Sequence, residues 1–459
     1  MDAVTIGELA DVLGAERTDL DVTSSFGAVS IDSRTIKAGE VFWAIEGDRF
    51  DGHSFLPDAE SAGATAAVVS RDCETGINCL RVENVQQSLT QFAAWYRGML
   101  LGTVVGITGS VGKTTCRRMI HDVLSSRYGV TQSPKNFNNH FGVPLSLLSA
   151  SSQDDYIVLE LGASAIGEIR SLSELAAPEI GVVTAIAPAH LDGFGSLEDI
   201  RTAKGELVEA LPPFGIALLN GDDAEVRTLA QRADCGVKFF GTTADCDIRA
   251  TSVLASADEL RFEVDGHDYS LSVAGVHNLT NALAAVAVGR EAGLLPNEIQ
   301  EGLATFAPAA GRCQVRRFGS SVVIDDTYNA SPKSMQAAAQ TLGQFKTHAH
   351  RILVVGDMAE LGKDAESLHL ETGKACGNAA DIDLILAVGL FASQLVAGAA
   401  SAGTEAVAAN DHDSLVEMLL ARFQPGDAVL VKGSRSARME RVVEALSNRL
   451  SESVDAELD

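Results

Sequence analysis

The chain has 459 residues, too many for one ordinary hydrophobic core, so about three domains are expected. It contains 35 Lys and Arg against 62 Asp and Glu, a formal charge of −27, with the acidic residues spread along its whole length. Such a surface repels nucleic acid and anionic lipid, and we expect neither as a partner. An anionic small molecule would have to be met locally by Lys, Arg or Mg²⁺.

Cysteine usage and the first residues indicate the compartment. The seven cysteines are irregularly spaced, form no CxxC pair and are odd in number, which favours a reducing compartment without disulfides. The N-terminus lacks a basic segment followed by an apolar run, and no stretch approaches 18 apolar residues. We therefore expect a cytoplasmic monomer without stable membrane contact.

Residues 1–84 alternate short apolar segments with glycine turns, which predicts a small α/β domain. Strands are expected at Val41–Ile45 and Ala66–Ser70. A helical segment, Ser88–Arg97, then leads into the second region of the chain.

A glycine-rich loop opens this second region. It lies between the β-branched segment Gly102–Thr108 and the helical pattern of Cys116–Leu124, where backbone N–H groups and the helix dipole favour an anion. The residues that would surround the phosphates are Gly109, Ser110, Val111, Gly112, Lys113, Thr114 and Thr115. Lys113 would reach the β and γ phosphates and Thr114 would hold Mg²⁺. Ile107 stands where the common P-loop pattern has a glycine, but a nucleoside triphosphate is still predicted.

Continuous apolar runs typical of buried parallel strands follow, at Tyr156–Leu161, Ile180–Ile186 and Ile216–Asn220. Glu160 ends the first run, so its carboxylate should lie at the same sheet edge as the glycine loop and could hold Mg²⁺ there. His190 is presented by an irregular loop at that edge. Lys204, in an expected helix, taken alone has the features of a solvated lysine.

Two polar loops complete the candidate site. Asn138 and Asn139 precede a short helical segment and could hydrogen-bond a phosphate or carbonyl, although Asn-rich loops are often simple turns. Farther along, a strand ends in two acids, and Ser331-Pro332 has the pattern of an N-cap with a first-turn proline. This geometry would gather Asp326, Tyr328 and Asn329 at the mouth of a third domain.

The strands expected in the third region are Ser321–Asp325, Arg351–Val355, Leu384–Val388 and Ala428–Lys432. With helical sequence between them they predict a second doubly wound sheet. The fold class is therefore α/β in three domains: residues 1–84, a central ATPase-like parallel sheet over 85–313, and a Rossmann-like domain over 314–459.

Segments spread over nearly the whole chain, in order, resemble the Mur ligases. They are Thr108–Thr115, Asn138–Pro144, Glu160–Gly162, Ala189–Ser196, Ala203–Glu206, His277–Asn281 and Asp325–Pro332. Two of them, around His190 and Asp326, look most like the family member that joins D-alanyl-D-alanine to UDP-N-acetylmuramoyl-tripeptide. The Asn-Pro-Arg signature of the diaminopimelate- or lysine-adding member is not found. The resemblance implies an ATP-dependent amide ligase of peptidoglycan precursor synthesis with those two substrates as partners.

The resemblance also implies roles for individual residues. Lys204 matches a lysine that the family carbamylates to bind a second Mg²⁺, with His190 and Glu160 completing the metal environment, and Lys113, His190 and Lys204 would be catalytic. Asn278 and Asn281 match the adenine-side motif, Arg312 a hinge arginine that touches the phosphates, and Asp326 an acid that contacts ATP.

Substrate contacts are implied in the same way. Ser33 and Arg34 resemble the uridine nucleotide site and would hold diphosphate or uracil, and the remaining expected substrate contacts are Asn138, Asn139, Tyr328 and Asn329. Because the glycine loop and Asp326 lie on different domains, closure about Arg312 is expected to exclude water.

Three other functions remain open on the sequence. A different amide ligase of the same superfamily, such as the diaminopimelate-adding or folylpolyglutamate enzymes, would keep the loop and change the acceptor. A P-loop kinase or ATPase would form no amide. A regulatory module would bind ATP and leave it intact, but it would give Glu160, His190 and Lys204 no purpose.

Overall fold

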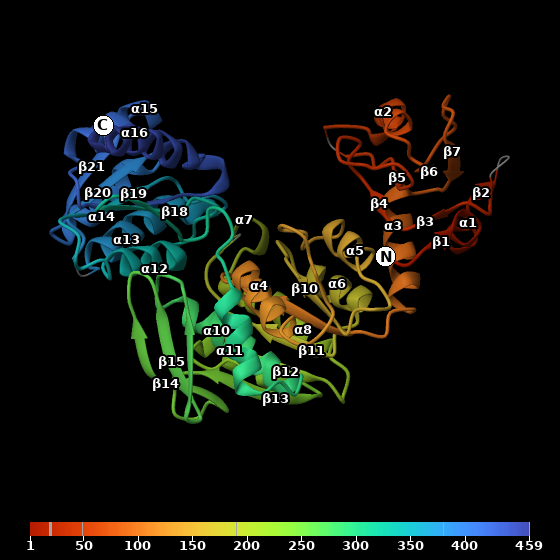
Figure 1. The fold of residues 1–459 in the computed structure, drawn as a ribbon, viewed down its shortest axis with the longest axis horizontal. Coiled ribbons are helices and arrows are strands. Elements are labelled where there is room, and N and C mark those ends of the chain that lie inside the picture. The colour runs from red at the N-terminus through yellow and green to blue at the C-terminus, as the bar shows by residue number, and fades with distance from the viewer. Residues whose placement is uncertain (18–20, 48, 190, 380, 459) are drawn as a thin grey trace.

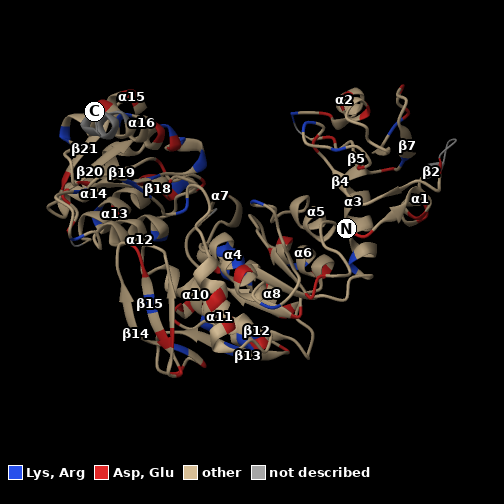
Figure 2. Cartoon of the chain, viewed as in Figure 1, with Lys and Arg blue, Asp and Glu red and all other residues tan. Residues whose placement is uncertain are grey.

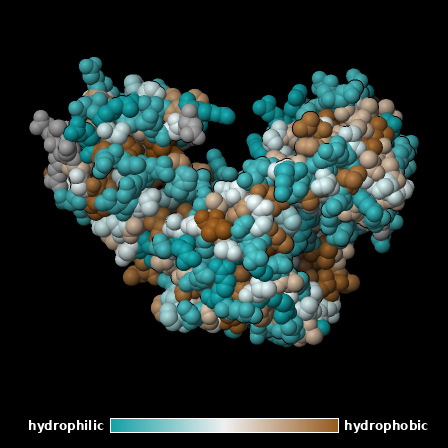
Figure 3. Space-filling view, turned by 180° about the vertical axis from the view of Figure 1, so that it is seen from behind, coloured by the Kyte–Doolittle hydropathy of each residue, from teal (hydrophilic) through white to brown (hydrophobic). Residues whose placement is uncertain are grey.

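A computed structural model describes residues 1–17, 21–47, 49–189, 191–379 and 381–458 of the chain. An N-terminal lobe and a C-terminal lobe stand on the same side of a central lobe (Figure 1). Seen from behind, a notch separates the two outer lobes (Figure 3). Within the described ranges, no helix has both the length and the apolar character needed to cross a bilayer.

The N-terminal lobe holds a five-stranded sheet in the order β2-β7-β6-β5-β4 and a small β1-β3 pair. Its strands are β1 Val4–Thr5, β2 Glu16–Arg17, β3 Ser25–Phe26, β4 Val29–Ser30, β5 Val41–Trp43, β6 Ala66–Val69 and β7 Asn78–Arg81. Its helices are α1 Ile6–Leu13, η1 Gly52–Phe55, α2 Leu56–Ser61 and α3 Val85–Arg97. The predicted strands and helix are confirmed, with ends that differ by a few residues.

One hydrophobic core continues from this lobe into the next. Phe92 of α3 packs with Trp43 of the first sheet, and the same cluster of buried residues includes Leu161 and Ile169 of the central lobe. Helix α3 therefore attaches the N-terminal lobe to the central sheet over a continuous apolar surface.

The central lobe is built on a nine-stranded sheet in the order β16-β15-β14-β13-β12-β11-β8-β10-β9. Its strands are β8 Thr103–Thr108, β9 Val130–Gln132, β10 Tyr156–Glu160, β11 Ile180–Val183, β12 Ile216–Asn220, β13 Gly236–Gly241, β14 Ile248–Ala255, β15 Leu260–Val264 and β16 His267–Leu271. Its helices are α4 Lys113–Leu124, α5 Gly142–Leu147, α6 Glu168–Ala176, α7 Leu191–Phe194, α8 Leu197–Glu209, α9 Ala224–Thr228, η2 Leu229–Arg232, α10 Asn278–Glu291 and α11 Pro296–Thr305.

Strands β8, β10, β11 and β12 are as predicted, but the sheet is not parallel throughout residues 85–313. Strands β14, β15 and β16 instead form an antiparallel meander at one edge. The burial along β14 and β15 alternates, as expected for strands with one face on the core and one in solvent. The order of the parallel strands puts β8, which leads into the glycine loop, between β10 and β11.

The C-terminal lobe has a six-stranded sheet in the order β17-β18-β22-β19-β20-β21. Its strands are β17 Gln314–Phe318, β18 Ser321–Asp326, β19 Arg351–Val355, β20 Leu384–Val388, β21 Glu405–Ala409 and β22 Ala428–Lys432. Its helices are α12 Pro332–Leu342, η3 Gly362–Asp364, α13 Ala365–Gly377, α14 Ala392–Ser401, α15 His412–Arg422, η4 Arg435–Ala437 and α16 Glu440–Leu458. Strands β17 and β21 were not predicted; β17 is antiparallel to β18 and β21 is parallel to β20.

Helices cover both faces of this sheet, which confirms the doubly wound prediction. One core cluster joins the sheet to α12 and α13, including Met335 and Cys376, while a second joins its other face to α15 and α16, including Leu415 and Val442. The connection after β18 therefore leaves toward one face and that after β22 toward the other. The carboxyl ends of these neighbouring strands border a crevice, the usual place for a ligand in an open α/β sheet.

Candidate active site

A cleft of about 2400 Å³ lies between the carboxyl edge of the central sheet and that of the C-terminal sheet. Of the described residues that line it, nine are Lys or Arg and five are Asp or Glu. The chain as a whole carries a formal charge of −27. The cleft therefore concentrates positive charge against the global field, as expected for an anionic ligand.

The glycine loop forms the floor of this cleft and is held in one conformation. Gly109 and Gly112 have positive φ angles of 149° and 86°, and a Cβ at Gly109 would overlap the hydroxyl of Thr184. The hydroxyl of Ser110 donates to the carbonyl of Ala187 at 2.8 Å and accepts from the N–H of Ala187 at 3.0 Å. Thr184 Oγ1 donates to the carbonyl of Val111 at 2.6 Å. The loop therefore depends on both glycines and on the connection after β11.

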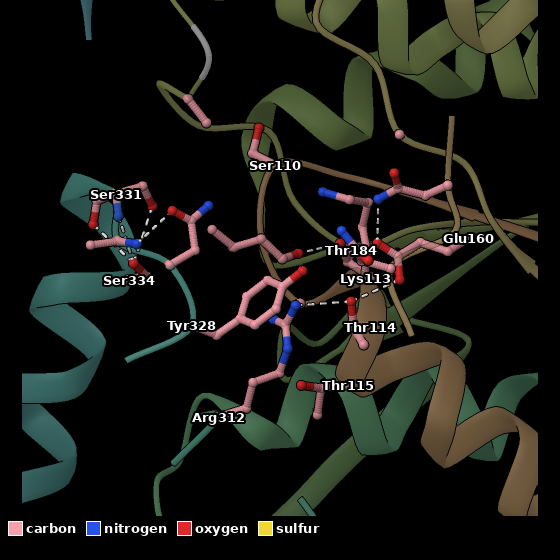
Figure 4. Close-up of a pocket in the computed structure, with 18 of the residues that line it drawn as sticks. Ser110, Lys113, Thr114, Thr115, Glu160, Thr184, Arg312, Tyr328, Ser331 and Ser334 are labelled. Atoms are coloured by element: carbon pink, nitrogen blue, oxygen red, sulfur yellow. Dashed lines mark hydrogen bonds between the residues drawn. The ribbon is translucent and has the colours of Figure 1, made fainter. Parts of the chain in front are cut away.

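Thr114 and Glu160 meet beneath the loop (Figure 4). Thr114 Oγ1 donates to Glu160 Oε2 at 2.7 Å, and Asn138 Nδ2 donates to Glu160 Oε1 at 2.8 Å. The guanidinium of Arg117 lies 3.7 Å from the same carboxylate and donates to the carbonyls of Ser133 and Lys135. Glu160, Thr114 and Arg117 are buried, so the polar partners of the carboxylate are these neighbouring side chains rather than bulk water.

Two cations lie beside this carboxylate. Lys113 Nζ donates to the carbonyl of Gly109 at 2.8 Å, which folds the side chain over the loop. Desolvation is the main cause that lowers the pKa of Lys113. The charge of Arg312 lowers this pKa further, whereas the charge of Glu160 raises it. Arg312 Nη2 donates to Thr114 Oγ1 at 3.0 Å, and its guanidinium lies 4.1 Å from the centre of the Tyr328 ring (Figure 4). Arg312 thus touches both the loop and the C-terminal lobe.

The first turn of α10 brings the predicted asparagines to the loop. Asn278 and Asn281 are both buried, and Asn278 Nδ2 donates to the carbonyl of Ala274 at 2.9 Å. A Cβ at Gly112 would lie 2.7 Å from Asn281 Oδ1, so the asparagine needs a glycine there. Both asparagines and Thr115 line the cleft.

The C-terminal wall gathers the other predicted residues. Asp326 Oδ2 accepts from Lys432 Nζ at 2.7 Å, and the carbonyl of Asn329 accepts from the same ammonium at 2.7 Å. Asp326 Oδ1 also accepts the N–H of Cys313 at 3.1 Å, which ties the strand end to the connection between lobes. Asp326, Tyr328 and Asn329 all line the cleft, as does Asn139, whose side-chain oxygen accepts from Gly142 N, the first residue of α5, at 2.9 Å.

Lys204 lies on α8, outside the cleft lining. It is buried, whereas its local sequence alone predicts a solvated lysine. Its Nζ is 5.4 Å from the centre of the Phe194 ring. Desolvation, with the charge of Lys113 as the next cause, lowers the pKa of Lys204 to about 7, although Glu168 and Glu206 act in the opposite direction. A neutral amine is therefore accessible to this side chain near neutral pH.

Two other predictions lie apart from the cleft floor. Ser33 and Arg34 are in the N-terminal lobe and are not among the described residues that line the cleft; Arg34 Nη2 pairs with Asp32 Oδ2 at 2.7 Å. The hydrogen bond from Arg34 is the main cause that lowers the pKa of Asp32. The charge of Lys135, a residue of the cleft lining, lowers this pKa further. His190 lies outside the described residues.

A metal site can be tested only on the donors that the structure describes. Within those residues, no group of three or more His, Cys, Asp and Glu side chains is arranged to hold a metal. Thr114 Oγ1 and Glu160 Oε2 are nevertheless 2.7 Å apart, close to the roughly 2.9 Å that separates neighbouring oxygens around octahedral Mg²⁺. This pair fits one Mg²⁺, and hard oxygen donors are the type that Mg²⁺ prefers.

Sequence reasoning identified only Lys113 and Arg312 among the basic residues of the cleft lining, and three of those that it missed form ion pairs in the site. Arg117 lies on the apolar face of α4, and Lys432 ends an apolar strand in register with Asp326. Both positions break an otherwise apolar pattern, which is the signal that could have identified them. Lys333 of α12 pairs with Asp223 of the central lobe at 2.9 Å, a contact between lobes that has no sequence signal.

Comparisons with known proteins agree on one family. The family models described as Mur ligase family, catalytic domain, as Mur ligase middle domain and as Mur ligase, glutamate ligase domain match residues 25–94, 107–289 and 311–435. The UDP-N-acetylmuramoyl-tripeptide--D-alanyl-D-alanine ligase of Escherichia coli K12 is 37% identical, over 97% of this chain and 99% of its own. The Bacillus subtilis protein of the same name is 34% identical, over 91% and 92%.

Solved structures show the same relationship. A crystal structure of MurF from Acinetobacter baumannii has a TM-score of 0.89 and 30% identity, covering 97% of this chain and 99% of that chain. MurF from Thermotoga maritima, solved in complex with ADP, has a TM-score of 0.81 and 29% identity, covering 93% and 98%.

Proposed function

This chain belongs to the Mur ligase family, and from that membership we propose that it joins D-alanyl-D-alanine to UDP-N-acetylmuramoyl-tripeptide at the expense of ATP. The observation that carries the proposal is the composition of the cleft. A phosphate loop with Lys113, Thr114 and Glu160 faces the acidic and amide groups of a second lobe across one space. An ATPase, whose phosphoryl acceptor is water, would not need that second wall.

Amide formation from a carboxylate requires the oxygen to be made a leaving group. A carboxylate oxygen of the peptide attacks the γ-phosphorus of ATP, the bond to ADP breaks, and an acyl phosphate forms. The amine of D-alanyl-D-alanine then attacks the acyl carbon, loses a proton, and the C–O bond to phosphate breaks. The products are ADP, phosphate and the UDP-linked pentapeptide.

The residues on the central wall would stabilise charge during the first transfer. Lys113 and the backbone N–H groups of the glycine loop would face the phosphates, and Arg312 links the loop to the C-terminal lobe through Thr114 and Tyr328. Fixed groups of this kind give most of the rate in phosphoryl transfer. Asn278 and Asn281 would hold the adenine side of the nucleotide.

Mg²⁺ would be held by Thr114 and Glu160 and, when bound, would neutralise phosphate charge. A second ion would need Lys204 carbamylated, with His190 beside it. The buried position of Lys204 and its pKa of about 7 support this, because only an uncharged amine reacts with CO₂. Carbamylation would also remove a buried positive charge next to Lys113.

The residues that contact the substrates would come from all three lobes. Ser33 and Arg34 would hold the uridine diphosphate, with Asn138 and Asn139 along the peptide and Asp326, Tyr328 and Asn329 beside the acceptor and ATP. Closure about Arg312 would exclude water from the acyl phosphate. We propose a cytoplasmic, monomeric enzyme, consistent with a substrate that is a soluble nucleotide.

Phosphate release tests this function directly. ATP, UDP-N-acetylmuramoyl-tripeptide and D-alanyl-D-alanine are mixed with the enzyme, and each is omitted in turn. Release should require all three, and mass spectrometry should show the pentapeptide. Release in the absence of the dipeptide at the full rate would instead indicate an ATPase.

A further inference from the structure

Two arginines on the C-terminal wall of the cleft have no part in the roles above. Arg435 and Arg438 follow β22, line the cleft and are exposed. Figure 2 shows basic residues at the edge of the C-terminal lobe that faces the notch, where this turn lies. In a chain with a formal charge of −27, exposed guanidinium groups inside a cleft are placed to meet an anion.

The neighbouring cations of this wall are already paired. Lys432 binds Asp326 at 2.7 Å and Lys333 binds Asp223 at 2.9 Å. By contrast, Arg435 Nη1 lies 3.6 Å from Glu440 Oε1, which is beyond hydrogen-bond distance, and its side chain is 74% exposed. Among the residues that the structure describes, the guanidinium of Arg438 has no ion-pair partner.

The turn that carries them is held firmly. The N–H of Ser434 donates to the carbonyl of Asp357 at 3.0 Å, and His412 Nε2 lies 2.7 Å from the carbonyl of Ala437. Met439 is fully buried, and a Cβ at Gly356 would lie 2.8 Å from its sulfur. Arg438 has a φ of 50°, a left-handed conformation that a non-glycine residue adopts only where its surroundings enforce it. The backbone under both arginines is therefore fixed before any ligand binds.

The turn after β22 lies beside the end of β18, the strand that carries Asp326. Asp326 and Lys432 are register partners at the ends of these two strands, and neighbouring strands lie about 4.8 Å apart. An extended dipeptide spans about 7 Å, enough to cross from one strand end to the next. With its amine near Asn329 and Asp326, its carboxylate would lie on the side of the turn after β22. The phosphates of ATP would face the glycine loop and Arg312 on the opposite wall.

We propose that Arg435 and Arg438 bind the C-terminal carboxylate of the acceptor dipeptide and so turn its amine toward the acyl phosphate. The planar guanidinium matches a carboxylate with two parallel hydrogen bonds, which an ammonium cannot do. This assignment rests on the proposed function, since it names how that reaction holds its acceptor. It also explains why Arg438 has no ion-pair partner among the described residues of the cleft, and why Arg435 has only a long ion pair, 3.6 Å, with Glu440.

Steady-state kinetics with two acceptors provide the test. The acceptors are D-alanyl-D-alanine and its C-terminal amide, which keeps the amine and loses the negative charge. The enzymes are wild type, Arg435→Ala, Arg438→Ala and Arg438→Lys, with Arg441→Ala as the control. Arg441 is also exposed, follows on the next turn, and is outside the cleft lining.

The wild type should use the amide with kcat/KM on the order of 10- to 100-fold below the free dipeptide, as expected for a lost charge-assisted pair. Each alanine variant should raise KM for the dipeptide by a similar factor, leave KM for ATP and for the UDP substrate within about 2-fold, and lose the preference for the carboxylate. Arg438→Lys should recover only part of the preference, and Arg441→Ala should match the wild type.

A wild type that treats the two acceptors alike, or alanine variants that keep the full preference, would overturn the assignment. Either result leaves the ligase activity itself intact. If the wild type instead shows no release of phosphate that depends on all three substrates, the proposed function fails before the arginines are tested. The two failures are thus distinguished by the wild type alone.

Discussion

The two walls of the cleft are built on different principles. On the central wall, Thr114 and Glu160 are buried and hydrogen-bonded to each other, the buried Arg117 forms an ion pair with Glu160 at 3.7 Å, and Ser110 and Thr184 hold the glycine loop in place. On the C-terminal wall, Arg435 and Arg438 are exposed; Arg435 has only a solvent-exposed ion pair with Glu440, and Arg438 has none among the described residues. The charged groups of the central wall are therefore buried against one another, whereas these two arginines are exposed in the cleft.

This difference between the walls matches the two tasks of the proposed reaction, which are phosphoryl transfer and binding of the acceptor. Charge stabilisation at a transferring phosphoryl group requires donors that do not move, and buried groups that hold one another meet that need. Acceptor binding requires exchange of the dipeptide in each turnover, which an exposed wall allows. Changes in the central wall should therefore reduce kcat, while changes in the C-terminal wall should act on the KM of the acceptor or on lobe closure.

The largest expected effect comes from Lys204. Lys204→Ala should lower kcat by on the order of 10³-fold or more, because a metal ligand would be lost, and short carboxylic acids should restore part of it. Glu198→Ala, at a site 74% exposed on the same helix, should retain wild-type activity. A Lys204→Ala enzyme with normal turnover would show that this lysine has no chemical role.

The pH dependence of Lys204 gives a second measurement on the same residue. Its pKa of about 7 is below the ordinary 10.5, so the neutral amine forms as pH rises through 7. Reactivation of CO₂-depleted enzyme by bicarbonate should therefore be faster at pH 8 than at pH 6. Between pH 7 and 10.5 the unfolded chain holds a proton that the folded chain has lost, so this group makes the fold more stable as pH increases.

The bridge between Lys333 and Asp223 should give smaller effects that differ at its two ends. Lys333 is 48% exposed and Asp223 only 7%, and Asp223 also accepts from Ile186 N at 3.2 Å and caps α9. Lys333→Ala should cost less than about 1 kcal/mol of stability and change kcat by about 2- to 5-fold, by loosening closure. Asp223→Ala should cost about 1–3 kcal/mol, because buried N–H groups lose their acceptor.

Thermal unfolding and kcat measure both variants. Lys346→Ala, an exposed lysine of the C-terminal lobe outside the cleft, serves as the control. Equal losses of stability at the two ends of the bridge would contradict the contrast between the walls.

Much of the fold follows from local pattern in the sequence. The apolar runs that predict β8, β10, β12 and β22 are buried parallel strands, and Ser331 and Pro332 begin α12 as an N-cap and first-turn proline should. The meander β14 to β16 was missed because half-buried strands lack a continuous apolar run. Strand β17 was missed for the same reason, since its central residues Arg316 and Arg317 are basic.

The candidate site also contains residues that the sequence could place and residues that it could not. Glu160 could be placed from sequence because the end of a buried parallel strand has a defined position in the sheet. The burial of Lys204 could not, because it depends on α8 packing beside the ring of Phe194. The pairing of Lys333 with Asp223 could not be predicted because it arises only where two lobes meet. The exposure of Arg435 and Arg438 depends on how the turn after β22 packs within the C-terminal lobe. The roles of Ser33, Arg34 and His190 stay predictions.

The transfer of one oxygen atom tests the central claim most directly. The terminal peptide carboxylate of the UDP substrate is labelled with ¹⁸O, the reaction is run to completion with ATP and D-alanyl-D-alanine, and the released phosphate is analysed by mass spectrometry. Lys113→Ala serves as the matched enzyme that should release no phosphate. If ATP phosphorylates the carboxylate, each phosphate released should carry one ¹⁸O from the peptide. Phosphate without that label would show that the γ-phosphoryl group goes to water, and would contradict the mechanism.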